Sequence, residues 1–306
     1  MTGVDSGLNH IVANDTHREN LTYRILMTVP RGFQETSTFP DADLATLLEL
    51  EQIEPDIFRA NLVFEDQWHL YGGQVAAQAL MAAGRTVTEE RRPHSLHGYF
   101  LRPGDASIPT IFVVDRDRDG RSFSARRVVA RQNGKVIFSM AASFTGSGPD
   151  LNRQAHEMPQ VPAPEECPVW EIPRMFSLVG AIPPAPSGRR KSAWPSTFWA
   201  RSRDRLGDSP LLNACALTYL SDVSGAVDHF DTPGWDGAAS LDHAVWFHHP
   251  TRVDEWLLTH YTPQTVADGR GLYTGSIFDQ SGAVVASIAQ EGLYQRVGYQ
   301  PATRGQ

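Results

Sequence analysis

Several features that would define other classes of protein are scarce or missing in this sequence of 306 residues. It holds only two cysteines, Cys167 and Cys215, which is too few for a disulfide framework and favours a reducing, cytoplasmic location. No apolar run approaches the roughly 20 residues that a membrane-spanning helix needs, so no transmembrane segment is expected. Lys and Arg number 27 against 35 Asp and Glu, which argues against a nucleic-acid partner. The 41% of hydrophobic residues predict a globular protein with an ample core.

The motifs of several common catalytic machineries are also missing. There is no G-x-S-x-G nucleophile elbow, so an α/β-hydrolase is not expected. Neither a G-x-x-x-x-G-K-[ST] loop nor a G-x-G-x-x-G after a strand occurs, and we predict no cofactor. His243, His248 and His249 lack HExxH or Cys/His spacing, so we interpret them as structural histidines and predict no metal.

Two segments that are apolar almost all round indicate helices that must be surrounded by protein. Residues 75–83 contain one polar residue, Gln78, and residues 211–220 form the second segment. Strand-like runs follow each of them, at 94–101, 108–115, 122–132 and 135–145 in the first half and at 240–248, 255–264, 271–279 and 283–293 in the second. Asn133 and Gly134 separate two of these runs, as in a type I′ hairpin.

The two series of runs align with each other at a shift of 148 residues. Residues 127–144 and 275–292 then share five identities: Gln132/Gln280, Gly134/Gly282, Val136/Val284, Ser139/Ser287 and Ala141/Ala289. This match predicts a duplicated unit, each copy a helix enclosed by a curled antiparallel sheet. Gln290 falls on Ala142, so one copy carries a polar group that the other lacks.

Composition divides the chain into five parts. We expect a mobile N-terminal extension at 1–40, a first unit at 41–146, a linker at 147–195, a second unit at 196–296 and a tail at 297–306. The linker is predicted because ten of the 21 prolines lie between residues 146 and 195, which disfavours regular core elements.

Long, ordered motifs in both units point to a known family. The first unit contains YGGQVAAQAL (71–80), HSLHGYFLRPGD (94–105) and DGRSFSARRVVARQNGKVIF (119–138), and the second contains YLSD (219–222), ASLDHAVWFHHP (239–250) and VASIAQEGL (285–293). These motifs closely resemble those of the acyl-CoA thioesterase II family, whose members hydrolyse fatty acyl-CoA to free acid and CoA. The resemblance implies an α+β tandem (double) hotdog, in which each curved antiparallel sheet is wrapped around a central helix. It also implies a homo-oligomer, at least a dimer.

The resemblance further implies an active site in the second hotdog that holds the attacking water. The family's Asp, hydroxyl residue and Gln fall on Asp222, Ser240 and Gln290. A thioester expels a thiolate whose pKa is near the ~8.5 of a cysteine thiol, so a carboxylate that accepts the proton of water suffices without a strong general acid. Gly72 and Gly73 are predicted to offer backbone N–H groups to the substrate oxyanion, or else only to permit close helix packing.

Other interpretations remain open from the sequence alone. The basic stretch of Arg116, Arg118, Arg121, Arg126, Arg127 and Arg131 would suit the phosphates of CoA, or it lines a solvated strand surface. A hotdog enoyl-CoA hydratase would need a close Asp/His pair, for which Asp222 and His229 are the candidates. A non-catalytic acyl-CoA or lipid-binding module would keep the tunnel without turnover.

Overall fold

The computed structural model describes residues 43–64, 69–146, 148, 151–170, 172, 177–184, 195–223, 232 and 234–296. All of these residues belong to one unit, residues 34–306. The extension predicted at 1–40, the tail predicted at 297–306 and His229 lie outside the described residues. None of the helices in the described part of the chain combines the length and the hydropathy of a membrane span.

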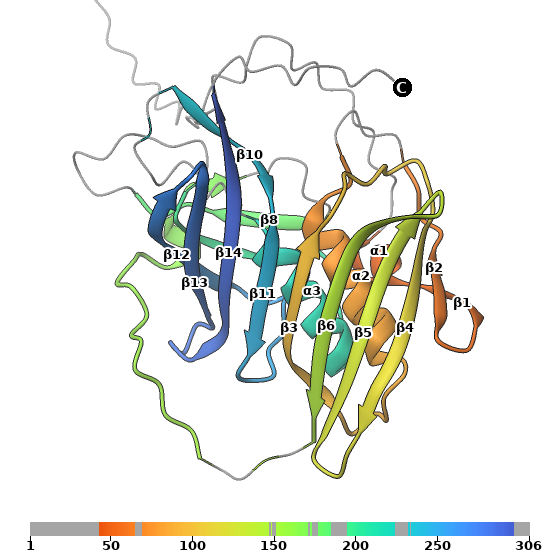
Figure 1. Ribbon diagram of the computed structural model, residues 1–306. Coiled ribbons are helices and arrows are strands. Elements are labelled where there is room, and N and C mark those ends of the chain that lie inside the picture. Colours follow the sequence, from red (N-terminus) through yellow and green to blue (C-terminus); the bar gives the residue numbers. More distant parts are fainter. Residues whose placement is uncertain are drawn as a thin grey trace, which may run out of the picture. The chain divides into compact units, whose positions relative to one another are not determined.

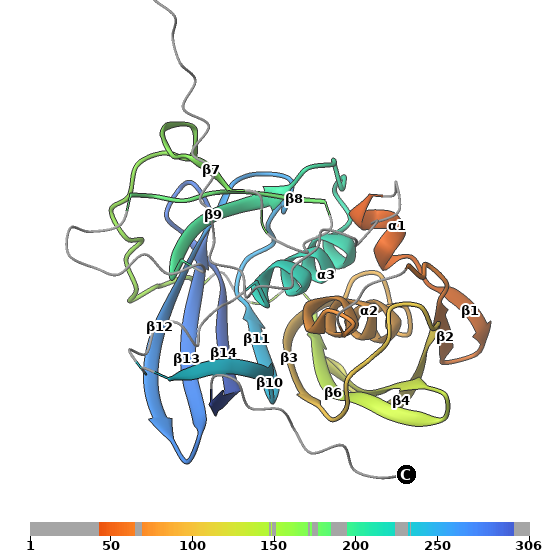
Figure 2. The ribbon, with the colours of Figure 1, turned by 90° about the horizontal axis from the view of Figure 1, so that it is seen from above.

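The first half is an antiparallel sheet curved around the helix α2, Gly72–Gly84 (Figure 2). Its strands, in spatial order, are β1 (Glu51–Glu54), β2 (Ile57–Ala60), β4 (Thr110–Asp119), β5 (Phe123–Gln132), β6 (Lys135–Thr145) and β3 (Arg92–Phe100). A short helix α1, Leu44–Leu48, precedes them, and the Asp43 carboxylate caps it by accepting the Thr46 N–H at 2.7 Å. Asn133 and Gly134 both have positive φ, as the predicted hairpin turn requires.

The second half repeats this arrangement around the helix α3, Pro210–Ser221. Its strands continue the same sheet in the order β11 (Asp242–Phe247), β14 (Val284–Arg296), β13 (Arg270–Phe278), β12 (Leu257–Ala267), β9 (Thr197–Ser202), β8 (Leu178–Ala181) and β7 (Val169–Trp170), while β10 (Trp235–Ser240) also pairs with β14. A 3-10 turn, η1, spans Pro164–Glu166. Both helices are buried almost all round, as their sequences predict.

The two halves join where β3 pairs with β11, side by side in Figure 1. Leu96 pairs with Val245 and His97 with Ala244, and a shift of 148 residues exchanges these two pairs, as in a symmetrical strand pair. The order β4-β5-β6-β3 on one side mirrors β12-β13-β14-β11 on the other. The architecture is therefore the α+β double hotdog that the sequence predicts, with the two copies forming one continuous sheet.

Two details differ from the sequence expectation. Within the predicted linker, β8 and β7 pair antiparallel at the edge of the sheet, and Trp170 and Leu178 are buried in the core. Short edge strands can form between prolines because the N–H groups on the outer side of an edge strand need no partner in the sheet. The run predicted at 240–248 is divided at Leu241 into β10 and β11, so Ser240 is the last residue of β10.

Candidate functional site

The C-terminal end of α3 carries the predicted carboxylate. The helix begins with the Ser209 side chain accepting the Leu212 N–H and with Pro210 in the first turn, where a missing N–H costs nothing. It ends at Ser221, so Asp222 occupies the C-cap. A carboxylate at this end of a helix faces the negative end of the helix dipole, which disfavours its charge. Its position therefore has to be maintained by other contacts.

Two tyrosine hydroxyls fix the end of α3. Tyr71 donates to the carbonyl of Tyr219 at 2.7 Å, and Tyr261 donates to the carbonyl of Ser221 at 2.8 Å. The last carbonyls of a helix lack partners within the helix, so these hydroxyls supply hydrogen bonds that would otherwise be missing. Because they bind the backbone on both sides of the final turn, they restrict the direction in which Asp222 points.

The structure brings the three predicted residues together from three elements. The Gln290 Nε2 group on β14 donates to Asp222 Oδ1 at 2.9 Å, and it also donates a short hydrogen bond to Ser240 Oγ on β10. Asp222 is 8% exposed and Gln290 is 2% exposed, whereas Ser240 is partly exposed. Gln290 is thus the central member, and Ser240 lies nearest to solvent.

Gln290 also contacts a residue that the sequence interpretation set aside as structural. The His243 Nδ1 atom lies 2.5 Å from Gln290 Oε1, and its Nε2 atom lies 2.7 Å from Ser221 Oγ. The neighbouring Asp242 accepts the Glu291 N–H at 2.7 Å. The Asp242-His243 and Gln290-Glu291 pairs thus contact each other across the neighbouring strands β11 and β14. No local pattern in the sequence distinguishes His243 from the other strand histidines.

Burial dominates the electrostatics of this cluster. It raises the pKa of the Asp222 carboxyl above its ordinary value, against smaller opposing effects from His243, from the Gln290 hydrogen bond and from the Gly73 N–H. It lowers the pKa of His243, against the smaller opposing effect of the Asp222 charge. Each group is therefore less readily charged than in water. A buried carboxylate with a raised pKa is a stronger base than an exposed one.

The two glycines at the start of α2 lie directly against this carboxylate. The Gly73 N–H donates to Asp222, so this amide is directed to the carboxylate. A Cβ on Gly72 would stand 2.8 Å from Asp222 Oδ2 and 2.9 Å from the Phe100 ring, and a Cβ on Gly73 would stand 2.7 Å from the Tyr219 carbonyl. Both glycines thus permit the close approach of α2 to the end of α3.

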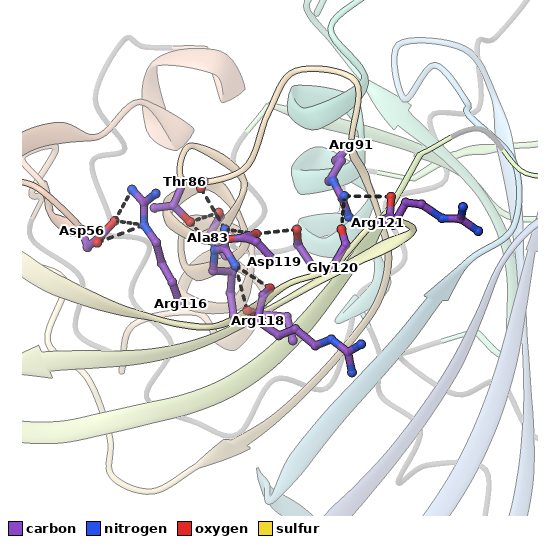
Figure 3. A network of polar contacts seen from close by, with 12 residues as sticks. Asp56, Ala83, Thr86, Arg91, Arg116, Arg118, Asp119, Gly120 and Arg121 are labelled. Carbon is purple, nitrogen blue, oxygen red and sulfur yellow. Dashed lines mark hydrogen bonds and ion pairs between the residues drawn. The ribbon is translucent and has the colours of Figure 1, made fainter.

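The corresponding helix end in the first half is built differently (Figure 3). The fully buried Arg126 on β5 donates to Thr86 Oγ1 and the Thr86 carbonyl, to the carbonyls of Arg118 and Ala125, and to the Asp119 carboxylate, all at 2.7 to 3.1 Å. Its partners Thr86, Arg118 and Asp119 are labelled in Figure 3. A guanidinium thus binds Thr86 just after the C-terminal end of α2, whereas a carboxylate caps α3. Its positive charge complements the negative end of the helix dipole.

Arg126 also explains why the first half lacks the polar group of the second. Its register partner on β6 is Ala142, the residue that aligns with Gln290. Among the other arginines of this stretch, Arg116 pairs with Asp56 at 2.8 Å and Arg127 with Asp117 at 2.9 Å. The interpretation of this basic stretch as a solvated strand surface is wrong for Arg126, because its side chain faces the interior of the sheet.

We expect replacement of Arg126 to lower stability without altering turnover per folded molecule. Arg126→Met leaves the Thr86 and Arg118 carbonyls and the Asp119 carboxylate without this donor, which costs about 1–3 kcal/mol for each buried group left unpaired. Thermal unfolding should show a clear fall in Tm. The matched control is Arg127→Met on the adjacent, outward position, where an exposed ion pair contributes at most ~1 kcal/mol. Equal Tm values for the two variants would contradict this account.

His243 and His248 are both engaged by neighbouring side chains. His248 lies 2.9 Å from Ser287 Oγ, and His243 is engaged by Gln290 and Ser221. Within the described residues, no three His, Cys, Asp or Glu side chains are grouped closely enough to hold a metal ion.

Comparison with known proteins gives a consistent result over nearly the whole described chain. A family model described as the acyl-CoA thioesterase N-terminal domain matches residues 64–145, and one described as the acyl-CoA thioesterase C-terminal domain matches residues 153–294. Among solved structures, the acyl-CoA thioesterase II TesB2 from Mycobacterium marinum is 42% identical with a TM-score of 0.69, and the match covers 84% of this chain and 99% of that one.

Two further relatives come from a mammal and from a second bacterium. Acyl-coenzyme A thioesterase 8 of Homo sapiens is 33% identical over 280 residues, covering 82% of this chain and 88% of that protein. Acyl-CoA thioesterase 2 of Haemophilus influenzae is 33% identical over 279 residues, covering 82% of this chain and 96% of that protein. The matches thus extend across both hotdogs.

Proposed function

This chain belongs to the acyl-CoA thioesterase II family, and we propose that it hydrolyses fatty acyl-CoA thioesters with water activated at Asp222, Ser240 and Gln290. The observation that carries the proposal is the convergence of the three side chains from α3, β10 and β14 on one point beside the start of α2. The reaction needs no cofactor, because a carboxylate base and an activated water suffice for a thioester.

Asp222 acts as the general base in this proposal. The water oxygen bonds to the acyl carbon while one water proton passes to the Asp222 carboxylate. The tetrahedral intermediate then collapses, the carbon–sulfur bond breaks with its electron pair on sulfur, and the proton held by Asp222 returns to the thiolate of CoA. General-base catalysis of this kind contributes about 10²–10⁴-fold. No bond forms between the enzyme and the acyl group.

Ser240 and Gln290 orient the water. Gln290 uses its Nε2 hydrogens on Asp222 and Ser240, so the Ser240 Oγ accepts from Gln290. The Ser240 hydroxyl hydrogen is then directed away from Gln290 and donates to the lone pair of water, while Asp222 accepts a water proton. For the oxyanion we propose the Gly72 N–H at the start of α2, where the helix dipole favours negative charge.

The pH dependence of turnover follows from the pKa of Asp222. The base must be ionised, and burial raises its pKa above the ordinary 3.8. We therefore expect kcat to fall on the acid side at a pH above 3.8 and to reach a plateau at higher pH. A pH profile of kcat at saturating acyl-CoA measures this, and a kcat that stays constant down to pH 3.8 would contradict the assignment.

The proposed function is tested by thiol release from acyl-CoAs of C2 to C20 chains. We expect stoichiometric release of CoA and free acid, with a chain-length optimum set by the depth of the acyl channel. Tight acyl-CoA binding without released thiol over hours would instead indicate a binding module. Hydration of an enoyl-CoA without thiol release would indicate a hydratase.

We also propose that at least two copies associate in solution. Tyr99 on β3 is 62% exposed and Trp246 on β11 is 36% exposed, so large aromatic side chains face outward on the two central strands. Light scattering at micromolar concentration should give a mass of at least two chains.

The buried cysteines Cys167 and Cys215, which form no disulfide, support a reducing, cytoplasmic location.

A further inference from the structure

The carboxamide of Gln290 can adopt two orientations that differ by exchange of its oxygen and nitrogen. With Nε2 toward Asp222, the amide donates to the carboxylate at 2.9 Å and to Ser240 Oγ. In the exchanged orientation, the amide oxygen would face the carboxylate, and two acceptors would oppose each other in a buried site. The proposed mechanism works only in the first orientation, because the Ser240 hydroxyl needs a donor from Gln290 to direct its own hydrogen to water.

The group on the other side of Gln290 decides between these orientations. His243 is fully buried on β11, and its Nδ1 lies 2.5 Å from Gln290 Oε1. Because a carboxamide oxygen only accepts, Nδ1 must carry a hydrogen. In the exchanged orientation, this Nδ1–H would meet the amide hydrogens of Gln290 instead, so a protonated Nδ1 opposes the exchange.

Ser221 contacts the other ring nitrogen and is compatible with a hydrogen on Nδ1. Its Oγ lies 2.7 Å from His243 Nε2 and 2.8 Å from the carbonyl of Thr218. A neutral His243 with its hydrogen on Nδ1 accepts the Ser221 hydroxyl hydrogen at Nε2. A charged His243 donates from Nε2 to Ser221, and the hydroxyl then donates to the Thr218 carbonyl. The Gln290 oxygen, which can only accept, therefore requires the hydrogen on Nδ1, and Ser221 accommodates both charge states.

Neither nitrogen of His243 is available to substrate. One faces Gln290, the other faces Ser221, and the ring is buried between β11, α3 and β14. His243 therefore acts through Gln290 and is a positioning residue, not a second base. This role distinguishes His243 from the histidine of a hydratase Asp/His pair, which itself exchanges protons with substrate.

We propose that His243, with a hydrogen on Nδ1, is a positioning residue that fixes the carboxamide of Gln290 with its NH₂ group toward Asp222 and Ser240. The proposal rests on the function proposed above and adds a requirement to it. The Asp242-His243 pair is then a functional counterpart of the Gln290-Glu291 pair, to which it is hydrogen-bonded.

Three substitutions of His243 separate positioning from packing. His243→Asn places an amide NH₂ near the position of Nδ1, and His243→Gln places one near the position of Nε2. His243→Leu removes both donors. We expect His243→Asn to keep kcat within about fivefold of the wild type, and His243→Gln and His243→Leu to lose at least tenfold in kcat with little change in KM, the loss of a preorganised donor being worth up to ~10²–10³-fold. A packing role would instead favour Leu or penalise Asn and Gln equally.

A spectroscopic measurement tests the proposal without relying on the activity of these variants. Long-range ¹H–¹⁵N NMR correlations of wild-type protein with ¹⁵N-labelled histidine report which ring nitrogen of His243 bears a hydrogen. The signals of His243 are assigned by their loss in His243→Asn. We expect a hydrogen on Nδ1. A neutral ring with its hydrogen on Nε2 alone would overturn the proposal.

The controls distinguish this inference from the function on which it rests. His248→Leu alters another histidine of the second half, bound to Ser287, and should leave kcat unchanged. If the wild type releases no thiol, the proposed function fails. If the wild type is active and Asp222→Asn is not, but His243→Leu matches His243→Asn in kcat, the function stands and the positioning role fails.

Discussion

Asp222→Asn is expected to lower kcat for acyl-CoA hydrolysis at least a hundredfold while leaving the fold intact. The substitution removes the acceptor for the water proton, a contribution of about 10²–10⁴-fold. The amide that replaces the carboxylate is nearly isosteric, and its oxygen can still accept the Gln290 Nε2–H that Asp222 accepts at 2.9 Å. Steady-state thiol release at saturating acyl-CoA measures the loss.

Stability should change in the opposite direction to activity. Burial raises the pKa of Asp222 in the folded chain, so its charge is more costly there than in the unfolded chain. The stability associated with the protonated form is fully present below the ordinary pKa and is lost as the pH rises through the raised one. At neutral pH, Asp222→Asn removes this cost, and its Tm should equal or exceed that of the wild type.

An exposed aspartate supplies the matched control. Asp208 lies just before the start of α3, its side chain is 89% exposed, and it pairs with Arg252. Asp208→Asn changes the same functional group and should leave kcat within twofold of the wild type. Near-normal turnover in Asp222→Asn, or a lowered Tm that accounts for its inactivity, would contradict the assignment of the base.

The fold was predictable from the sequence because its strongest signals are local and repeated. Two helices without a polar face require an enclosing sheet, and the Asn133-Gly134 hairpin fixes one strand pair. The 148-residue shift then predicts the relation between the halves. The strands β7 and β8 were not predicted, since they span only two and four residues and prolines surround them. Segments this short show no periodic pattern.

The site was only partly predictable, and the missed residues share a physical cause. Asp222, Ser240 and Gln290 were identified through family motifs, because three polar residues spread over about seventy positions carry no local signature. His243 looked like one of several strand histidines until its partners were visible. Arg126 looked like part of an exposed basic stretch, whereas the pleat of β5 points it inward while Arg127 faces solvent. One position in register separates the two outcomes.

Gly72→Ala is expected to lower kcat by about a hundredfold although it alters no catalytic side chain. The new Cβ would stand 2.8 Å from Asp222 Oδ2 and 2.9 Å from the Phe100 ring, closer than a methyl group can approach. The carboxylate must therefore move, and a displacement of about 1 Å in an aligned site costs on the order of 10²-fold. The proposed contact of the Gly72 N–H with the oxyanion would also be disturbed, which lowers kcat further.

The same clash should lower stability, because forcing extra volume into a packed core costs about 1–3 kcal/mol. The test therefore compares kcat per folded molecule at a temperature below the Tm of the variant. Gly146→Ala is the control, because a Cβ at Gly146 meets no atom within 4 Å, and its kcat should match the wild type. A Gly72→Ala enzyme of normal kcat would mean that Asp222 can shift freely, and a water aligned by three fixed side chains would then no longer explain the catalysis.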